Sequence, residues 1–216
     1  MTEQPKSYKV LILGDCSVGK TSLLIRYIDG KINDSGLLSS VGMDLKIKFL
    51  KYQDRDIQLE LWDTAGQERF HSITNNFLKR SDGVVILYDI TNKQTFVNIK
   101  YWVKSINESL NIKDIGVVLC GNKCDCDDFD RDVTYEEGKE VADEYEVDFF
   151  ETSCKEDINV NQTFITLIEG MMKVEERKKE IASTRERSSS KLEKRSTNEK
   201  EDKNERKEKQ KKECGC

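Results

Sequence analysis

Short apolar runs alternate with polar segments along the first 172 residues. Four continuous runs predict strands buried on both faces of a parallel sheet: "YKVLILG" (8–14), "VVILYD" (84–89), "GVVLCGN" (116–122) and "DFFET" (148–152). Two further segments alternate apolar with polar residues and are joined by "KYQDRD", which predicts a hairpin at one sheet edge: 45–50 and 57–62.

Between these runs, apolar residues recur at helical spacing in two sets: Phe96, Ile99, Trp102, Val103 and Ile106, then Val160, Phe164, Leu167, Ile168 and Met171. Strands alternating with helices predict a single α/β domain with a mostly parallel six-stranded sheet and helices on both faces. Ligands of such sheets bind at the carboxyl ends of the strands, so the loops there should carry the chemistry.

The charge pattern separates a body from a tail. Residues 173–216 contain 16 Lys and Arg against 11 Asp and Glu, and few aliphatic residues. Subtracting these from the chain's 36 Lys and Arg and 41 Asp and Glu leaves 20 and 30 in residues 1–172. We expect a short extension (1–7), a domain (8–174), a disordered charged tail (175–213) and a final Cys-Gly-Cys (214–216). The tail could also be a merely solubilising extension.

The acidic body argues against nucleic acid as the main ligand, because a duplex binder needs positive charge on its folded surface. An odd cysteine count, the absence of a secretory signal in "MTEQPKSY" and the lack of a long apolar run predict a reduced cytosolic protein without a membrane span. Cys120, Cys124 and Cys126 are a weak zinc candidate, since their spacing is not a paired C-x2-C.

The strongest motif is "GDCSVGKT" (Gly14 to Thr21), which matches G-x-x-x-x-G-K-[ST] between a predicted strand and a predicted helix. Glycines let backbone amides surround phosphate oxygens, and the following helix offers its positive end. Lys20 then reaches the β- and γ-phosphates, and Thr21 supplies a hydroxyl to Mg²⁺. The motif predicts a nucleoside triphosphate but not its base.

A second motif, "NKCD" (Asn122 to Asp125), follows the 116–122 strand. The Asp125 carboxylate can accept from both N1–H and the exocyclic amine of guanine, whereas adenine has no N1 donor. Lys123 can lay its aliphatic stem along the base. Taken alone, the motif is more typical of an ordinary polar turn.

A third motif, "WDTAGQE" (Trp62 to Glu68), ends the second hairpin strand. Asp63 suits a carboxylate that holds Mg²⁺ through water, Gly66 allows a backbone amide close to the γ-phosphate, and Gln67 can orient the attacking water. Three loops therefore converge on one ligand.

With "ETSCK" (151–155), these motifs occur in the order and spacing of Ras-superfamily small GTPases, over residues 7 to about 174. "RFHSIT" (69–74), "LYDIT" (87–91) and the Cys-Gly-Cys ending resemble Rab proteins. The resemblance implies a P-loop small G domain that binds GTP or GDP with Mg²⁺ and acts as a switch in vesicle traffic.

The resemblance also assigns residues. The Ser153 and Cys154 backbone would contact guanine O6, Lys155 would stack on the base, and Ser40 would close over Mg²⁺ and the γ-phosphate. The full nucleotide set is Gly14, Asp15, Cys16, Ser17, Val18, Gly19, Lys20, Thr21, Ser22, Ser40, Gly66, Asn122, Lys123, Asp125, Ser153, Cys154 and Lys155. Metal ligands would be Thr21, Ser40 and Asp63, and catalytic residues Gln67 and Lys20.

Two departures bear on the chemistry. Ser40 stands where relatives carry threonine, so its rotamer is less restricted and the triphosphate state should be looser. Cys16 lies where relatives carry a small residue; it either disturbs Gln67 and slows hydrolysis or points outward without effect.

The effector triad of the family corresponds to Leu45, Trp62 and Phe77, although Trp62 could also be plain core support. Leu45 replaces the usual phenylalanine, so effector choice should not be carried over from a relative. By resemblance, partners would be an exchange factor, an activating protein, effectors, an escort protein and a GDP-dissociation inhibitor.

A C-a-a-X box would need cysteine where Glu213 stands, so that interpretation fails. The resemblance of the Cys-Gly-Cys ending to Rab proteins implies instead that Cys214 and Cys216 are both geranylgeranylated. Two lipid chains hold a protein stably, with nearby Lys and Arg helping on an anionic leaflet. We expect the cytoplasmic face of intracellular membranes, with cycling through the cytosol. Two alternatives stay open: a slowly hydrolysing nucleotide-binding scaffold and, less favoured, an ATP-using P-loop kinase.

Overall fold

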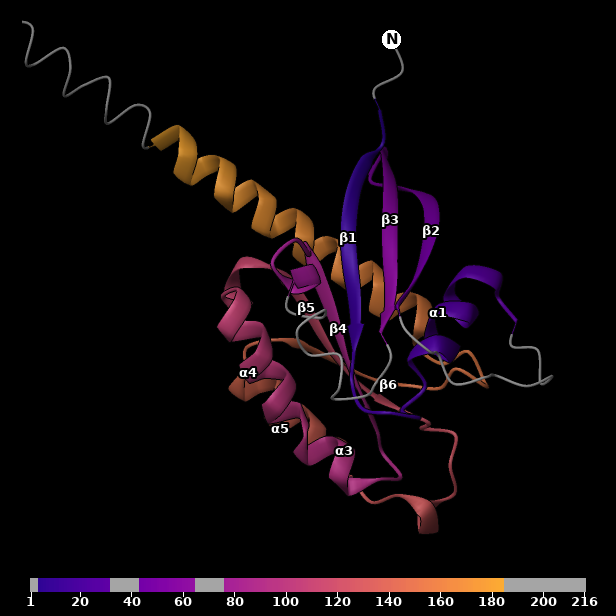
Figure 1. Ribbon diagram of the computed structural model, residues 1–216. Coiled ribbons are helices and arrows are strands. Elements are labelled where there is room, and N and C mark those ends of the chain that lie inside the picture. Colours follow the sequence, from indigo (N-terminus) through magenta and orange to yellow (C-terminus); the bar gives the residue numbers. More distant parts are fainter. Residues whose placement is uncertain (1–3, 32–42, 65–75, 185–216) are drawn as a thin grey trace, which may run out of the picture. The chain divides into compact units, whose positions relative to one another are not determined.

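The computed structural model describes residues 4–31, 43–64 and 76–184 (Figure 1). By contacts the chain divides into two units, Met1–Val174 and Glu175–Cys216. The first contains a six-stranded sheet in the order β2-β3-β1-β4-β5-β6. Its strands are β1 (Lys6–Leu13), β2 (Met43–Tyr52), β3 (Arg55–Thr64), β4 (Gly83–Asp89), β5 (Gly116–Asn122) and β6 (Asp148–Thr152).

The sheet is parallel except for the β2–β3 hairpin, which confirms the predicted fold class. The hairpin strands are longer than predicted, because "KYQDRD" continues the ladder on both sides of a two-residue turn. Both turn residues, Gln53 and Asp54, have positive φ (47° and 62°), as a tight hairpin turn requires. β1 likewise begins at Lys6, two residues before the expected start of the domain.

Alternate strand residues point to opposite faces, so the sheet builds two apolar cores. One core packs β1 and β5 residues such as Val10 and Val118 against α1 (Lys20–Asp29) and the helical residues 160–172. The other packs Leu11 and Ile86 mainly against α4 (Ile99–Ser109), with Ala142 of α5 (Tyr135–Glu144). Helices therefore cover both faces, as the apolar periodicity predicts (Figure 1).

The periodic stretch 96–106 forms two helices rather than one. α3 (Lys93–Val97) ends and α4 begins at Asn98, which caps both. Short 3-10 turns, η2 (Ile112–Asp114) and η3 (Asp128–Asp130), lie in the loops on either side of β5. None of the described helices is long and apolar enough to cross a membrane.

The charged segment differs from its predicted disorder over its first ten residues, because residues 175–184 are helical. Two local contacts lie within this helix: Lys179 pairs with Glu175 one turn away at 2.8 Å, and Thr184 Oγ1 donates to the Glu180 carbonyl oxygen. Residues 185–216, including Cys214 and Cys216, lie outside the described residues.

Candidate functional site

The loop from Gly14 to Gly19 joins β1 to α1 and depends on left-handed backbone conformations. Gly14 has φ 143°, Ser17 62° and Gly19 102°. A Cβ on Gly14 would lie 2.1 Å from the Leu87 carbonyl oxygen, and one on Gly19 would lie 2.3 Å from Asn122 Nδ2. Only glycine fits at either position, because a side chain would collide with a neighbouring segment and would also disfavour the positive φ.

Lys20 opens α1 with its side chain buried under this loop. Its Nζ donates to the carbonyl oxygens of Gly14 (2.9 Å) and Asp15 (2.6 Å). Burial lowers the pKa of Lys20, and the Asp63 carboxylate acts against that shift. The helix cap is Gly19, which has no side chain to bond the first-turn amides. An amine and a helix N-terminus thus face the same loop, an arrangement suited to phosphate.

The predicted metal ligands Thr21 and Asp63 come together although they are 42 residues apart. Thr21 Oγ1 donates to Asp63 Oδ2 at 2.6 Å, and Asp63 is only 1% exposed at the end of β3. A hydroxyl and a carboxylate are hard oxygen donors, so the pair fits Mg²⁺ bound together with phosphate oxygens. Among the described residues, no group of three or more His, Cys, Asp and Glu could hold a metal by itself.

The other residues predicted at the γ-phosphate, Ser40, Gly66 and Gln67, lie outside the described residues. Cys16 is exposed in the loop. The neighbouring Asp15 carboxylate is fixed by two contacts that the sequence does not reveal: it accepts from Asn98 Nδ2 (2.6 Å) and from the Trp102 indole Nε1 (2.9 Å). The phosphate loop is therefore attached to α4 as well as to the sheet.

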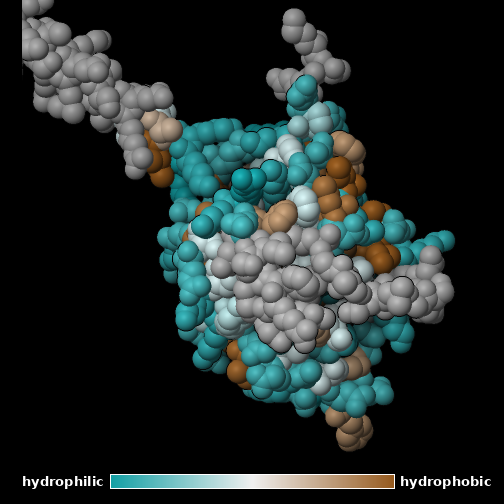
Figure 2. All heavy atoms as spheres, viewed as in Figure 1, coloured by the Kyte–Doolittle hydropathy of each residue, from teal (hydrophilic) through white to brown (hydrophobic). Residues whose placement is uncertain are grey.

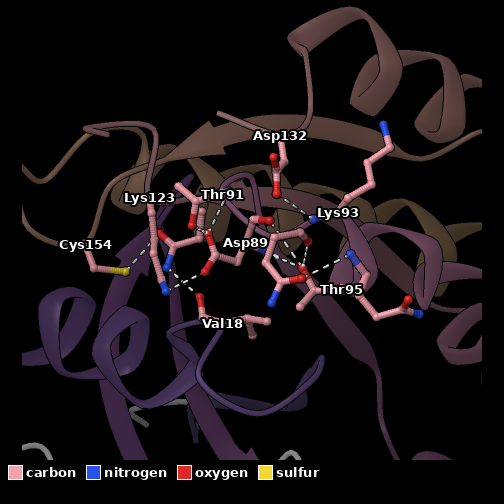
Figure 3. A network of polar contacts seen from close by, with 11 residues as sticks. Val18, Asp89, Thr91, Lys93, Thr95, Lys123, Asp132 and Cys154 are labelled. Atoms are coloured by element: carbon pink, nitrogen blue, oxygen red, sulfur yellow. Dashed lines mark hydrogen bonds and ion pairs between the residues drawn. The ribbon is translucent and has the colours of Figure 1, made fainter. Parts of the chain in front are cut away.

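Asn122, at the end of β5, joins three loops and is 2% exposed. Its Nδ2 donates to the Val18 carbonyl at 2.8 Å, and its Oδ1 accepts from Thr152 Oγ1 (3.2 Å) and from the Cys154 thiol (3.3 Å). Figure 3 shows this network, with Cys154 at its left edge and Val18 below it. The sequence predicts that Asn122 binds nucleotide; the structure gives it the additional task of holding the loops together.

Lys123 has a left-handed backbone (φ 70°), and its Nζ pairs with Asp89 Oδ2 at 2.5 Å (Figure 3). Asp89 is buried at the end of β4, where its Oδ1 also accepts from Thr91 N and Oγ1 (2.9 and 2.7 Å). This carboxylate fixes the direction of the lysine stem. Sequence reasoning missed Asp89, since a single aspartate after a strand carries no distinctive spacing.

The third loop, 153–155, places Lys155 Nζ 4.0 Å from Asp125 Oδ2, so the two predicted base contacts lie side by side. Ser153 is fully buried, with its Oγ accepting from Glu156 N at 2.9 Å. Burial raises the pKa of the Cys154 thiol to about 12, which keeps it protonated and able to donate to Asn122. The loop is thus internally ordered.

A further residue that the sequence does not single out, Arg26 of α1, contacts this loop. Its Nε donates to the Cys154 carbonyl oxygen (2.6 Å) and its Nη2 to the Lys155 carbonyl oxygen (2.7 Å). The partners are about 128 positions apart in sequence, so no local pattern could indicate the contact.

The three predicted effector residues also lie together. Leu45 on β2 is opposite Trp62 on β3 in the ladder, and the Trp62 and Phe77 ring centroids are 4.7 Å apart. Leu45 is 40% exposed, whereas Trp62 and Phe77 are only partly exposed and pack against a core. Figure 2 shows apolar residues gathered on the face where β2 lies, and its exposed members are Leu45, Ile47 and Phe49.

Comparison with known proteins agrees with this arrangement. The sequence model of the Ras family matches residues 9–173. Ras-related protein Rab-10 of Diplobatis ommata is 42% identical over 165 residues, 76% of this chain and 81% of that protein. Ras-related protein SEC4 of Saccharomyces cerevisiae is 42% identical over 166 residues, 75% of each chain. Human Ras-related protein Rab-8B is 41% identical over 165 residues, 76% of this chain and 78% of that protein.

The family match covers the phosphate loop, both hairpin strands and the two base loops, which are the parts that the geometry brings together. The chain therefore belongs to the Ras family and is a Rab-like small GTPase, a GTP-hydrolysing molecular switch of vesicle traffic.

Proposed function

We propose that the nucleotide lies across the carboxyl ends of β1, β5 and β6, with its phosphates on residues 14–22 and its base between Asp125 and the 153–155 loop. The observation that carries this proposal is the bond from Asn122 Nδ2 to the Val18 carbonyl. It joins the phosphate loop directly to the base-reading loop, so one ligand can reach both.

At the phosphate end, the Lys20 amine neutralises phosphate charge, and residues 14 to 19 supply backbone amides together with the first turn of α1. Mg²⁺, when bound, would supply positive charge to the β- and γ-phosphate oxygens. Thr21 and Asp63 would hold it, and the 2.6 Å contact between their oxygens supports this assignment. Ser40 is proposed as the third protein ligand, and Gly66 as an amide donor to the γ-phosphate.

At the base end, Asp125 accepts two hydrogen bonds from guanine, and amides of the 153–155 loop donate to O6. Lys123 and Lys155 cover the two faces of the base. Adenine would leave the Asp125 carboxylate unpaired, and a site of this kind discriminates by roughly 10⁴ to 10⁵. The tie between Lys123 and Asp89 supports a fixed stacking surface.

For hydrolysis, Gln67 orients a water molecule toward the γ-phosphorus. The new bond forms from water oxygen to phosphorus while the bond to the β-phosphate oxygen breaks, giving GDP and inorganic phosphate. Lys20 stabilises charge on the leaving oxygen. We expect a slow intrinsic rate that an activating protein raises, and nucleotide release that an exchange factor accelerates.

The surface of Leu45, Trp62 and Phe77 is proposed to bind effectors, and its apolar exposure on β2 supports this use. Cys214 and Cys216 are proposed to carry two geranylgeranyl chains, added with an escort protein and shielded by a GDP-dissociation inhibitor. These chains would place the protein on the cytoplasmic face of intracellular membranes.

The decisive experiment measures which nucleotide copurifies with the full chain, followed by calorimetric titration with GDP and ADP and by single-turnover GTP hydrolysis with Mg²⁺ or with EDTA. We expect bound guanine nucleotide, no measurable ADP binding and hydrolysis that stops in EDTA. Equal binding of ADP and GDP would overturn the proposed base site. GTP that stays intact with Mg²⁺ and an activating domain would favour a nucleotide-binding scaffold instead.

A further inference from the structure

Arg26 lies in the second half of α1 and donates hydrogen bonds from all three of its guanidinium nitrogens. Nε bonds the Cys154 carbonyl oxygen (2.6 Å), Nη2 the Lys155 carbonyl oxygen (2.7 Å) and Nη1 the Gly30 carbonyl oxygen (2.9 Å). The first two bonds reach the base loop, and the third holds the side chain against the end of its own helix. The planar fork of arginine suits this task, whereas lysine presents one point charge.

These bonds fix the orientation of peptide groups in the base loop. A trans peptide directs its C=O and the next N–H in opposite directions. Because the carbonyls of Cys154 and Lys155 face Arg26, the amides of Lys155 and Glu156 face away from it. The Glu156 amide indeed bonds Ser153 Oγ on the other side, at 2.9 Å.

The remaining peptide of the loop is fixed by other means. Ser153 and Ile158 exchange backbone bonds in both directions, at 3.1 and 3.0 Å, which sets the direction of the Cys154 amide. Arg26 is therefore the side chain that orients the next two peptides. Without it, the Cys154 and Lys155 carbonyls would lose their described donors.

Arg26 also connects the two ends of the site through one rigid helix. Lys20, at the start of α1, lies under the phosphate loop, and Arg26 follows six residues later. At about 1.5 Å per residue, the two positions are about 9 Å apart along the helix axis. A shift of α1 would consequently move the base loop and the phosphate loop together.

We propose that Arg26 is a positioning residue for guanine recognition, which orients the Lys155 backbone amide of the base loop toward O6 and couples that loop to the phosphate-binding helix. This inference rests on the proposed function, in which the 153–155 loop reads O6. Arg26 itself touches backbone carbonyls and acts through the peptides that it holds.

The test uses the full chain with Arg26→Met and Arg26→Lys, and Arg80→Met as a matched loss of an exposed arginine. Dissociation of GDP is measured by displacement of a fluorescent GDP. Affinities are then compared for GDP, for 6-thio-GDP, whose sulfur is a poor acceptor at position 6, and for IDP, which lacks only the 2-amino group that Asp125 reads. Thermal melting reports the stability of each variant.

We expect Arg26→Met to release GDP about tenfold faster, as expected for losing hydrogen bonds from a charged donor. Its preference for GDP over 6-thio-GDP should shrink, while its preference for GDP over IDP stays that of the wild type. Arg26→Lys should give an intermediate value of both quantities, and Arg80→Met should match the wild type.

An equal loss of affinity for all three nucleotides would mean that Arg26 merely supports the fold, which overturns the proposal. So would release of GDP from Arg26→Met at the wild-type rate. If Arg26→Met does not fold, wild-type values for Arg26→Lys would overturn it as well. Failure of the proposed function is distinguishable, because the wild type itself would then show no preference for GDP over ADP.

Discussion

The phosphate end and the base end of the site are built by different physical means. At the phosphate end, backbone conformation dominates: three residues between 14 and 19 have positive φ, and two glycines touch neighbouring segments too closely to accept a Cβ. At the base end, side chains tie the loops together, through Asn122, Arg26 and the pair of Lys123 with Asp89.

The two ends of the site should therefore respond differently to amino-acid substitution. A backbone cradle fails abruptly, because one added methyl group displaces several amides together. A loop held by several side-chain bonds weakens in steps, since each lost bond leaves the others in place. We therefore expect large effects of substitutions at the phosphate end and graded effects, seen mainly in base preference, at the other.

The largest effect should come from Lys20. Lys20→Met removes a buried charge beside the phosphates and two bonds to loop carbonyls. We expect GDP affinity to fall at least about 100-fold, as for the loss of a buried charge-assisted contact. The preference for GDP over ADP among nucleotides that still bind should persist. Calorimetry with both nucleotides measures the two quantities.

Lys123→Met is the matched control at the base end. Its partner Asp89 keeps the two bonds from Thr91, so the loop should stay folded and GDP affinity should fall only about tenfold. If Lys123→Met cost as much as Lys20→Met, the contrast between the two ends would be wrong.

The next largest effect should come from Gly19→Ala, which tests whether the two ends touch at this point. The new Cβ would be 2.3 Å from Asn122 Nδ2 in a backbone with φ 102°. We expect a loss of GDP affinity of about 10- to 100-fold, together with a weaker preference for GDP over ADP, since Asn122 must move.

Gly30→Ala is the control that separates backbone strain at a positive φ from the contact between a new Cβ and Asn122. Gly30 also has a positive φ (68°), but a Cβ added there would meet no atom within 4 Å. The substitution should lower the free energy of unfolding by about 1–2 kcal/mol and leave nucleotide affinity unchanged. Equal nucleotide affinities for the two variants would show that contact with Asn122 does not matter.

The sequence predicts the phosphate end of the site better than the contacts that hold the base end. The phosphate loop is readable because its chemistry is local: glycine positions, Lys20 and Thr21 lie within eight consecutive residues. The central parallel strands β4 and β5 are readable because burial on both faces makes them apolar throughout. The prediction of burial on both faces is wrong for Asp148–Thr152, because β6 is the edge strand of the sheet and is mostly half-buried. Apolar periodicity does not predict α5, although Thr134 and Glu137 form a capping box that could have indicated it.

The contacts that position the loops are not readable from the sequence. Arg26 and Cys154 are 128 residues apart, and Asp15 and Trp102 are 87 apart, so their pairing depends on the folded sheet. The helical spacing predicts Trp102 only as a core residue, and its buried indole does pack in one core. Its Nε1 donor is nevertheless directed at the phosphate loop.

A smaller effect is expected from Asp15, whose carboxylate attaches that loop to α4. Asp15→Ala removes the acceptor of Asn98 and Trp102. We expect GDP affinity to fall about three- to tenfold, with unchanged preference for GDP over ADP, because the backbone cradle itself remains. In a Trp62→Phe background Trp102 is the only tryptophan, so a change in its emission reports the lost bond. Unchanged emission and affinity would show that Asp15 does not help to hold the phosphate loop in its binding conformation.

The smallest effect concerns the thiols and changes no residue. Cys16 is exposed at the phosphate end, whereas Cys154 at the base end and Cys120 in the sheet are buried, and burial raises the pKa of each of the latter two to about 12. Iodoacetamide attacks through the thiolate, so raising the pH from about 7.5 to about 9.5 should leave both buried thiols nearly unlabelled in the folded protein. Their folded-state pKa values lie above the ordinary 9, so their contribution to stability is complete below about pH 9 and is lost as pH rises toward 12.

Peptide mass spectrometry after timed labelling should find Cys16 modified first, and Cys154 and Cys120 modified only after unfolding in urea. If native Cys154 were labelled as fast as Cys16, the 153–155 loop would open readily. The side-chain hydrogen bonds at the base end would then hold their loop less firmly than the backbone conformation holds the phosphate loop.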